Sequence, residues 1–173
     1  MARAVGQAAL KFANRIWIAL INNSDNIKEA ENLNAFRKAN GEDPLQIPNI
    51  GDVKETFITS HGIHVKRLVV AEKKWHQFYN KILNGVLWPM CHGHFDKVEK
   101  HKASDYDVIS RVNEGMAEVI VSKLNGQKNS NTPIWAHDYH HLPLARILKQ
   151  DHTITNPLLF FCHIPFPDPE RMK

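Results

Sequence analysis

Several side chains capable of chemistry follow a short apolar stretch in the last third of the chain. Residues 134–137 predict a buried strand that ends on His137 and leads into Asp138-Tyr139-His140-His141. A strand ending in this way brings a carboxylate, imidazoles and a phenol to one rim. There Asp138 can accept hydrogen bonds from sugar hydroxyls, and Tyr139 can stack on or bond a phosphorylated ring. The same residues also suit a structural role, in which Asp138 caps the next helix and His137 packs in the core.

A second histidine stands at the end of another apolar run. Residues 157–163 form this run, which ends on His163 and is followed by Pro165, Pro167 and Pro169. Three prolines so close together restrict the backbone, so the edge of the sheet would hold His163 with little conformational entropy left to lose. The alternative is a proline-rich exit loop with a histidine in the core.

An aromatic pair and a histidine cluster suggest two further kinds of site. Tyr79 precedes Trp88 by nine residues, and aromatic rings form the walls of sugar pockets because the apolar face of a hexose packs on them; both rings also suit a core. His92, His94 and Asp96 form an HxHxD run of ligand types found in zinc hydrolases. A solvated polar loop is the favoured interpretation, because Lys97 follows where a further histidine would strengthen the metal pattern.

The elements that position these residues alternate between helix and strand. The apolar spacing predicts helices over residues 4–14, 27–40, 72–83, 105–124 and 142–149, and strands over 15–20, 56–59, 63–70, 134–137 and 157–163. Residues 42–52 are predicted to be a loop, and His61-Gly62 a hairpin turn. Apolar strands buried on both faces and alternating with helices indicate an α/β fold with a Rossmann-like parallel sheet. Ligands of such sheets bind beyond the carboxyl ends of the strands.

Composition narrows the class of protein. The 173 residues, 43% hydrophobic and 23% charged, suit one globular domain, and the net charge of +4 suits anionic small molecules. Nucleic acid is disfavoured because no arginine-rich run is present, and no apolar run approaches the length of a membrane span. Cys91 and Cys162 are expected to be reduced thiols of a cytoplasmic protein. The first 24 residues carry no acidic side chain, so a transit peptide is the alternative.

The order of these segments matches a known family. The segments that carry the match are Phe78-Tyr79-Asn80, Leu87-Trp88-Pro89, Arg111-Val112-Asn113, Trp135-Ala136-His137-Asp138-Tyr139-His140, Leu142-Pro143 and Phe160-Phe161-Cys162-His163-Ile164-Pro165-Phe166-Pro167. In this order and spacing the sequence resembles glycosyltransferase family 20, the family of the trehalose-6-phosphate synthases.

The resemblance implies the GT-B architecture of two Rossmann-like domains. It also implies transfer of glucose from UDP-glucose to glucose-6-phosphate with retention at the anomeric carbon, without a cofactor or an obligatory metal. Carried over by position, Tyr79, Trp88, Asp138 and Tyr139 would bind the acceptor sugar phosphate. His163 would lie against the donor sugar, and Asp138 and His163 would be the catalytic residues.

The chain also departs from the family pattern. The first strand and the whole C-terminal domain of the family are absent, so residues 1–173 are expected to form a single incomplete acceptor-side domain that is inactive alone. Leu20 stands where the family has a tryptophan, and Cys91-His92-Gly93-His94 where it has Phe-His-Tyr-Arg. The alternatives are a non-catalytic binding or regulatory remnant, associated with a longer family member or with itself, and a histidine-rich metal-dependent hydrolase.

Overall fold

The computed structural model describes residues 15–47, 49–50, 53–58, 63–124 and 131–171. The chain forms two compact units, residues 1–72 and 73–173, and each unit is described by itself. The helix expected over residues 4–14 and the turn at His61-Gly62 lie outside the described residues.

The first unit contains a three-stranded sheet. β1 (Arg15–Asn22) pairs in parallel with β3 (Ile63–Val70), and β3 pairs antiparallel with β2 (Val53–Ile58), so the strand order is β1-β3-β2. A bulge between Glu55 and Phe57 interrupts the antiparallel register. The three strands expected in this region are confirmed, with β1 and β2 placed a few residues differently from the prediction.

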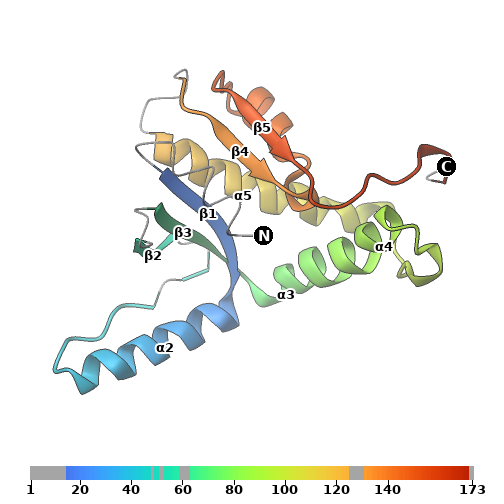
Figure 1. The fold of residues 1–173 in the computed structure, drawn as a ribbon. Coiled ribbons are helices and arrows are strands. Elements are labelled where there is room, and N and C mark those ends of the chain that lie inside the picture. The colour runs from blue at the N-terminus through green and yellow to red at the C-terminus, as the bar shows by residue number, and fades with distance from the viewer. Residues whose placement is uncertain (1–14, 48, 51–52, 59–62, 125–130, 172–173) are drawn as a thin grey trace. The chain divides into compact units, whose positions relative to one another are not determined.

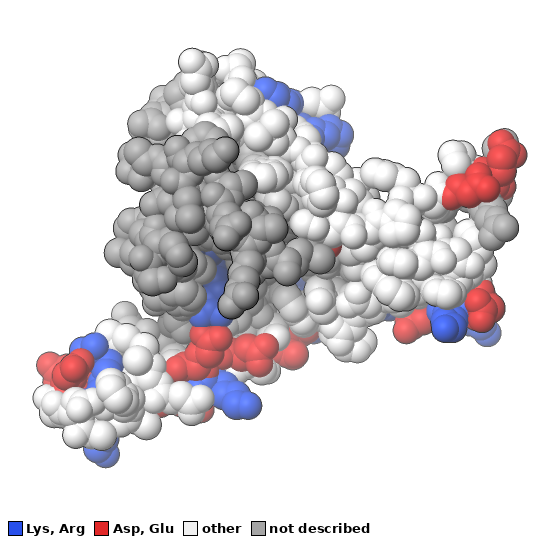
Figure 2. Space-filling view, viewed as in Figure 1, with Lys and Arg blue, Asp and Glu red and all other residues white. Residues whose placement is uncertain are grey.

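One polar surface helix follows β1. α2 (Asn23–Ala39) begins earlier than the predicted residue 27, because the side chain of Asn22 accepts the N–H of Asp25 at 2.8 Å and caps the helix. The helix stops at the predicted place, where Gly41 has a φ of 73° that suits glycine. Red and blue side chains lie along α2 in Figure 2, as its charged sequence predicts.

The second unit opens with a continuous helical stretch that changes its winding (Figure 1). α3 (Glu72–Trp75) is followed by the π-helical segment η1 (His76–Leu87) and by α4 (Trp88–Cys91). Hydrogen bonds in a π-helix reach the fifth residue, and the N–H of Trp88 accordingly donates to the carbonyl of Leu83. The helix predicted over residues 72–83 therefore exists but is longer and wider than expected.

A long helix and two short ones complete the core of this unit. α5 (Asp107–Leu124) packs against η1, against α6 (Leu144–Arg146) and against the π-helical segment η5 (Ile147–Asp151). Short 3₁₀ segments are η2 (Phe95–Lys97), η3 (Ala103–Tyr106), η4 (Tyr139–His141) and η6 (Pro169–Arg171). The largest fully buried apolar side chains of the unit are Phe78, Ile82, Leu83, Val86, Ile147, Leu148 and Ile154.

Two parallel strands carry the polar segments. β4 (Ile134–His137) and β5 (Leu158–Phe161) run side by side, with His137 opposite Phe161. The prediction that the apolar strand near residue 160 is buried on both faces is wrong for this chain, since Phe161 is 51% exposed. Leu159 and Phe160 are 49% and 42% exposed as well, so both faces of β5 lack a covering layer in the described part of the chain.

Within the described residues, no helix has the length and apolarity that crossing a membrane requires.

Truncation of the buried Leu83 should destabilise the second unit far more than truncation of an exposed leucine. Leu83 is 0% exposed and Leu142 is 47% exposed. Leu83→Ala should lower the free energy of unfolding by about 2–5 kcal/mol because it leaves a cavity. The matched variant Leu142→Ala should change it by roughly 0.5 kcal/mol or less. Urea unfolding followed by circular dichroism measures both, and equal effects would contradict the packing described.

Candidate functional site

The carboxylate of Asp138 joins the exits of the two parallel strands. Its Oδ1 accepts the backbone N–H of Tyr139 at 3.0 Å and that of His163 at 3.2 Å. The N–H of Asp138 also donates to the carbonyl of Phe161 at 2.7 Å, which extends the ladder between β4 and β5. The two polar strand ends expected from the sequence therefore meet, and one side chain holds them together.

The backbone of Asp138 adopts an uncommon conformation. Its φ is 72° and its ψ is 163°, in the half of conformational space that residues with a Cβ avoid. Such a conformation costs on the order of 1–3 kcal/mol and persists where surrounding contacts impose it. Through the same N–H of Tyr139 its carboxylate caps the short segment η4, whereas the following helix α6 has Pro143 at its N-cap and no side-chain cap, so the expected capping of that helix is wrong. The second oxygen, Oδ2, lies 3.5 Å from Nδ1 of His140.

Tyr139 is buried and takes a polar partner that the sequence did not single out. The side chain is 4% exposed, and its hydroxyl donates to Oδ1 of Asn84 at 3.0 Å. Burial, followed by the nearby Asp138 carboxylate, raises the pKa of Tyr139. The phenol therefore stays protonated and remains a donor to Asn84.

Tyr79 belongs to a row of stacked rings. It stacks on Trp75 with ring centroids 5.0 Å apart, and on His140 with centroids 5.6 Å apart. The ring of His140 continues to that of Tyr139 at 4.2 Å. The row connects the helical segment η1 to the strand exit at Asp138, so the helix and the sheet edge contribute to one site.

The π-helical winding brings Tyr79, Asn84 and Trp88 onto one side of the helix. At about 3.6 residues per turn, nine residues make two and a half turns, and an α-helix would place Tyr79 and Trp88 on opposite faces. In the wider π-helix nine residues make roughly two turns. All three residues are exposed, whereas Phe78 and Ile82 are buried, as this geometry requires.

Two histidines stack on the indole of Trp88. The ring of His92 lies 3.9 Å from it and the ring of His94 lies 6.2 Å from it, between centroids. Nδ1 of His92 lies 2.8 Å from the carbonyl of Trp88. Since a carbonyl can only accept, Nδ1 carries the proton, and Nε2 is left as an acceptor when the ring is neutral.

Asn113 in α5 is a further site residue that the sequence analysis missed. It is 0% exposed, and its Nδ2 donates to the carbonyls of Ile109 at 2.9 Å and His140 at 3.0 Å. Its Oδ1 lies 2.9 Å from Nδ1 of His141, which must therefore donate. A polar residue on the apolar face of a predicted helix was the available signal.

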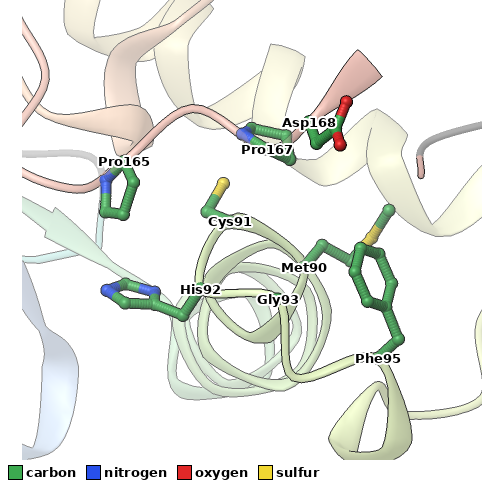
Figure 3. A pocket seen from close by; sticks show the side chains of 8 residues that line it. All are labelled: Met90, Cys91, His92, Gly93, Phe95, Pro165, Pro167 and Asp168. Carbon is green, nitrogen blue, oxygen red and sulfur yellow. The ribbon is translucent and has the colours of Figure 1, made fainter. Parts of the chain in front are cut away.

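A hollow of about 360 Å³ opens beside this site between the end of α4 and the proline-rich segment (Figure 3). Its lining residues are Met90, Cys91, His92, Gly93, Phe95, Pro165, Pro167 and Asp168. Cys91 and Cys162 are free, half-buried thiols. Burial and the nearby Cys162 and Asp138 raise the pKa of Cys91, so this thiol stays protonated.

His163 is held at its ring as well as at its backbone. Nε2 of His163 lies 3.2 Å from Nδ1 of His137, while its N–H donates to Asp138. Burial and His163 lower the pKa of His137, an effect that Asp138 partly opposes. His137 and His163 therefore lie at the same two strand ends, those of β4 and β5, as the carboxylate of Asp138.

The histidine-rich pattern does not converge on a metal centre in the described part of the chain. No cluster of three or more histidine, cysteine or acidic side chains there has an arrangement that could hold a metal ion. His92 instead pairs with the backbone carbonyl of Trp88, and Asp96 is exposed.

Charged side chains lie mainly toward the margins of this unit on the side shown in Figure 2.

Comparison with solved structures identifies the class of protein. One from Escherichia coli, described as trehalose-6-phosphate bound with UDP-2-fluoro glucose, matches with a TM-score of 0.68 and 28% identity over 98% of this chain. A UDP-forming α,α-trehalose-phosphate synthase from Burkholderia xenovorans, in complex with glucose-6-phosphate, matches in fold with a TM-score of 0.65 at 24% identity over 99% of the chain. The α/β fold is therefore that of a GT-B glycosyltransferase, as predicted.

The model of glycosyltransferase family 20 matches residues 14–173. The chain belongs to this family, and the resemblance recognised in the sequence is confirmed. The trehalose-6-phosphate synthase of E. coli O1:K1 is 38% identical over 101 residues, which are 58% of this chain, and that of Cronobacter sakazakii is 37% identical over 113 residues, or 65% of the chain.

The chain is short beside its relatives. The matched part covers 20% and 23% of those two synthases, and 31% and 32% of the two solved chains. The activity of the whole relatives is therefore a proposal for this chain.

Acidification below pH 6.5 should destabilise the second unit through its buried histidines. Burial, followed by His140, lowers the pKa of His141 from 6.5 to about 4. The pKa values of His137 and His140 are also lowered, first by burial. Because these folded-state values lie below the unfolded ones, the unfolded chain binds more protons, and the free energy of unfolding falls as the pH drops below 6.5. His141 alone accounts for at most about 3 kcal/mol at pH 4.

Urea unfolding between pH 7.5 and pH 4 measures this dependence. His141→Gln should flatten the dependence between pH 6.5 and pH 4. The matched variant His101→Gln, at an exposed ring, should leave it unchanged. An unaltered profile in His141→Gln would contradict the assignment.

Proposed function

We propose that this chain forms the acceptor-binding half of a retaining glycosyltransferase that transfers glucose from UDP-glucose to glucose-6-phosphate. Membership of glycosyltransferase family 20 supports the glycosyltransferase role. The names of the trehalose-6-phosphate synthases that it resembles support the choice of substrates.

The observation that carries the proposal is that the two carboxylate oxygens of Asp138 have different partners. Among the described residues, Oδ1 is occupied by two backbone N–H groups, whereas Oδ2 lies 3.5 Å from Nδ1 of His140. The side chain keeps 18% of its surface exposed. A carboxylate held by one oxygen at a parallel strand end presents the other to a sugar hydroxyl with little reorganisation.

Tyr79 and Trp88 supply the walls of the acceptor site in this proposal. Both rings are partly exposed and lie on one side of the same helix, and the apolar face of a hexose packs on such rings. Tyr139 supports the acceptor site indirectly, because its hydroxyl donates to Asn84. His163 lies against the donor sugar, and with Asp138 it forms the catalytic pair.

The remaining parts of the proposal concern cofactors, partners and location. The reaction uses two small-molecule substrates and no cofactor or metal, in the cytoplasm and without nucleic acid or membrane partners. The chain alone does not turn over, because stabilisation of the leaving diphosphate is the largest catalytic contribution and requires groups of the second GT-B domain. A longer family member or a second copy is the partner that we expect.

Glucose-6-phosphate should bind to this chain without the donor. In a titration followed by ¹H–¹⁵N spectra, we expect the amide signals of Tyr79, Trp88 and Asp138 to shift together at millimolar ligand. Tyr79→Ala should weaken binding about fivefold, since one ring contact contributes roughly 1 kcal/mol. The matched variant Tyr106→Ala removes a ring that packs on His101, outside the proposed acceptor wall, and should leave the affinity unchanged.

Two results would count against this function. No shift at millimolar glucose-6-phosphate would remove the acceptor site from this chain. Release of UDP from UDP-glucose and glucose-6-phosphate by the isolated chain would show that the second domain is not needed. Acceptor binding without turnover, even when a full-length family member is added, would favour the non-catalytic binding module.

A further inference from the structure

Four aromatic rings line one face of the two-stranded sheet. Trp135 and His137 alternate along β4, and Phe161 and His163 alternate along β5 and just beyond it. The ring of His163 lies between that of His137, with centroids 5.4 Å apart, and that of Phe161, with centroids 4.7 Å apart. The ring of Trp135 packs on the other end of the row, 4.6 Å from His137. His163 is therefore the one ring of the row that has an imidazole on one side and a phenyl group on the other.

The contact between the two imidazoles is specific to one pair of nitrogens. Nδ1 of His137 lies 3.2 Å from Nε2 of His163, and the two rings are nearly parallel, at 17°. Between two neutral imidazoles, one nitrogen of such a pair must be the donor and the other the acceptor. Whichever ring donates, the contact occupies Nε2 of His163 and couples the tautomer of one ring to that of the other, which leaves Nδ1 of His163 as the nitrogen that can meet a ligand.

The surroundings of His137 favour the neutral form of its imidazole. Burial and His163 lower the pKa of His137, against the opposing effect of Asp138. His137 is therefore neutral at pH 7.5. Two protonated rings would place two N–H groups toward each other without an acceptor, so the contact requires at least one neutral ring, and the lowered pKa of His137 supplies it.

We propose that His137 is a positioning residue for His163: its Nδ1 holds the His163 ring through Nε2, so that the ring presents Nδ1 alone to the donor sugar. The proposal rests on the proposed function insofar as it names the donor sugar. Asp138 fixes the backbone of His163 through its N–H, and His137 fixes the ring. The two neighbours at the end of β4 thus orient both parts of the residue at the end of β5.

The side chain of asparagine offers a matched test. Its amide group reaches the place of Nδ1 of a histidine, so His137→Asn retains a hydrogen-bonding group there. His137→Phe retains the stacked ring and removes the hydrogen bond. His76→Phe, at an exposed histidine of η1, controls for the loss of any one imidazole. Circular dichroism and thermal unfolding establish that each variant is folded.

Long-range ¹H–¹⁵N spectra of the histidine-labelled chain at pH 7.5, without ligand, report the tautomer of each ring. We expect one tautomer at His163 in the unaltered chain, in His137→Asn and in His76→Phe. In His137→Phe the two ring ¹⁵N shifts of His163 should move toward each other as the tautomers mix. Unchanged shifts in His137→Phe, or mixing in a folded His137→Asn, would overturn the proposal.

The donor is then added to the unaltered chain. UDP-glucose at millimolar concentration should shift the Nδ1 signal of His163 more than the Nε2 signal. The reverse order would overturn the positioning role. Absence of any shift would contradict the donor role of His163 in the proposed function, and the ligand-free spectra would still decide whether His137 orders the ring.

Discussion

The second unit depends on one constraint, the carboxylate of Asp138 between the exits of β4 and β5. Two short parallel strands provide few ladder hydrogen bonds, and parallel pairs are slightly less stable per residue than antiparallel ones. The bonds from Tyr139 and His163 to Oδ1 add a side-chain connection where the ladder ends. They also offset the cost of the positive φ at Asp138. Structural stability and the position of the site thus rest on the same atoms.

The second feature that shapes the site is the π-helical winding of η1. Long runs of i→i+5 hydrogen bonds are rare and are found often at functional sites. Here the wider turn places Tyr79, Asn84 and Trp88 on one side, while Phe78 and Ile82 face the core. A regular helix with the same sequence would separate Tyr79 from Trp88. The winding therefore matters for which residues can share a ligand.

Apolar patterning predicted β4, α5 and the meeting of the two strand exits, because these depend on local spacing and on the rule that parallel strands end at one edge. It did not predict η1 as a π-helix, since i→i+5 bonding leaves no periodic signature that distinguishes it from an ordinary helix over so short a span. The sequence did not assign Asn84 a role and named Asn113 only within the family match, because an isolated amide gains its meaning only from partners distant in sequence. The exposure of β5 depends on what packs on its two faces, which its own apolar sequence does not specify.

Asp138 and His163 each have two polar side-chain atoms, and the protein holds each residue through one of them. Among the described residues, Asp138 uses Oδ1 for two backbone N–H groups while Oδ2 lies 3.5 Å from His140, and His163 uses Nε2 for His137. Tyr139 has a single polar atom and directs it to Asn84, so it contributes to the site by supporting it. A group with two polar atoms can be fixed by one and still bind through the other, which limits the entropy lost when a ligand binds. For this reason Asp138 and His163, with one polar atom to spare, are better placed than Tyr139 to meet a substrate.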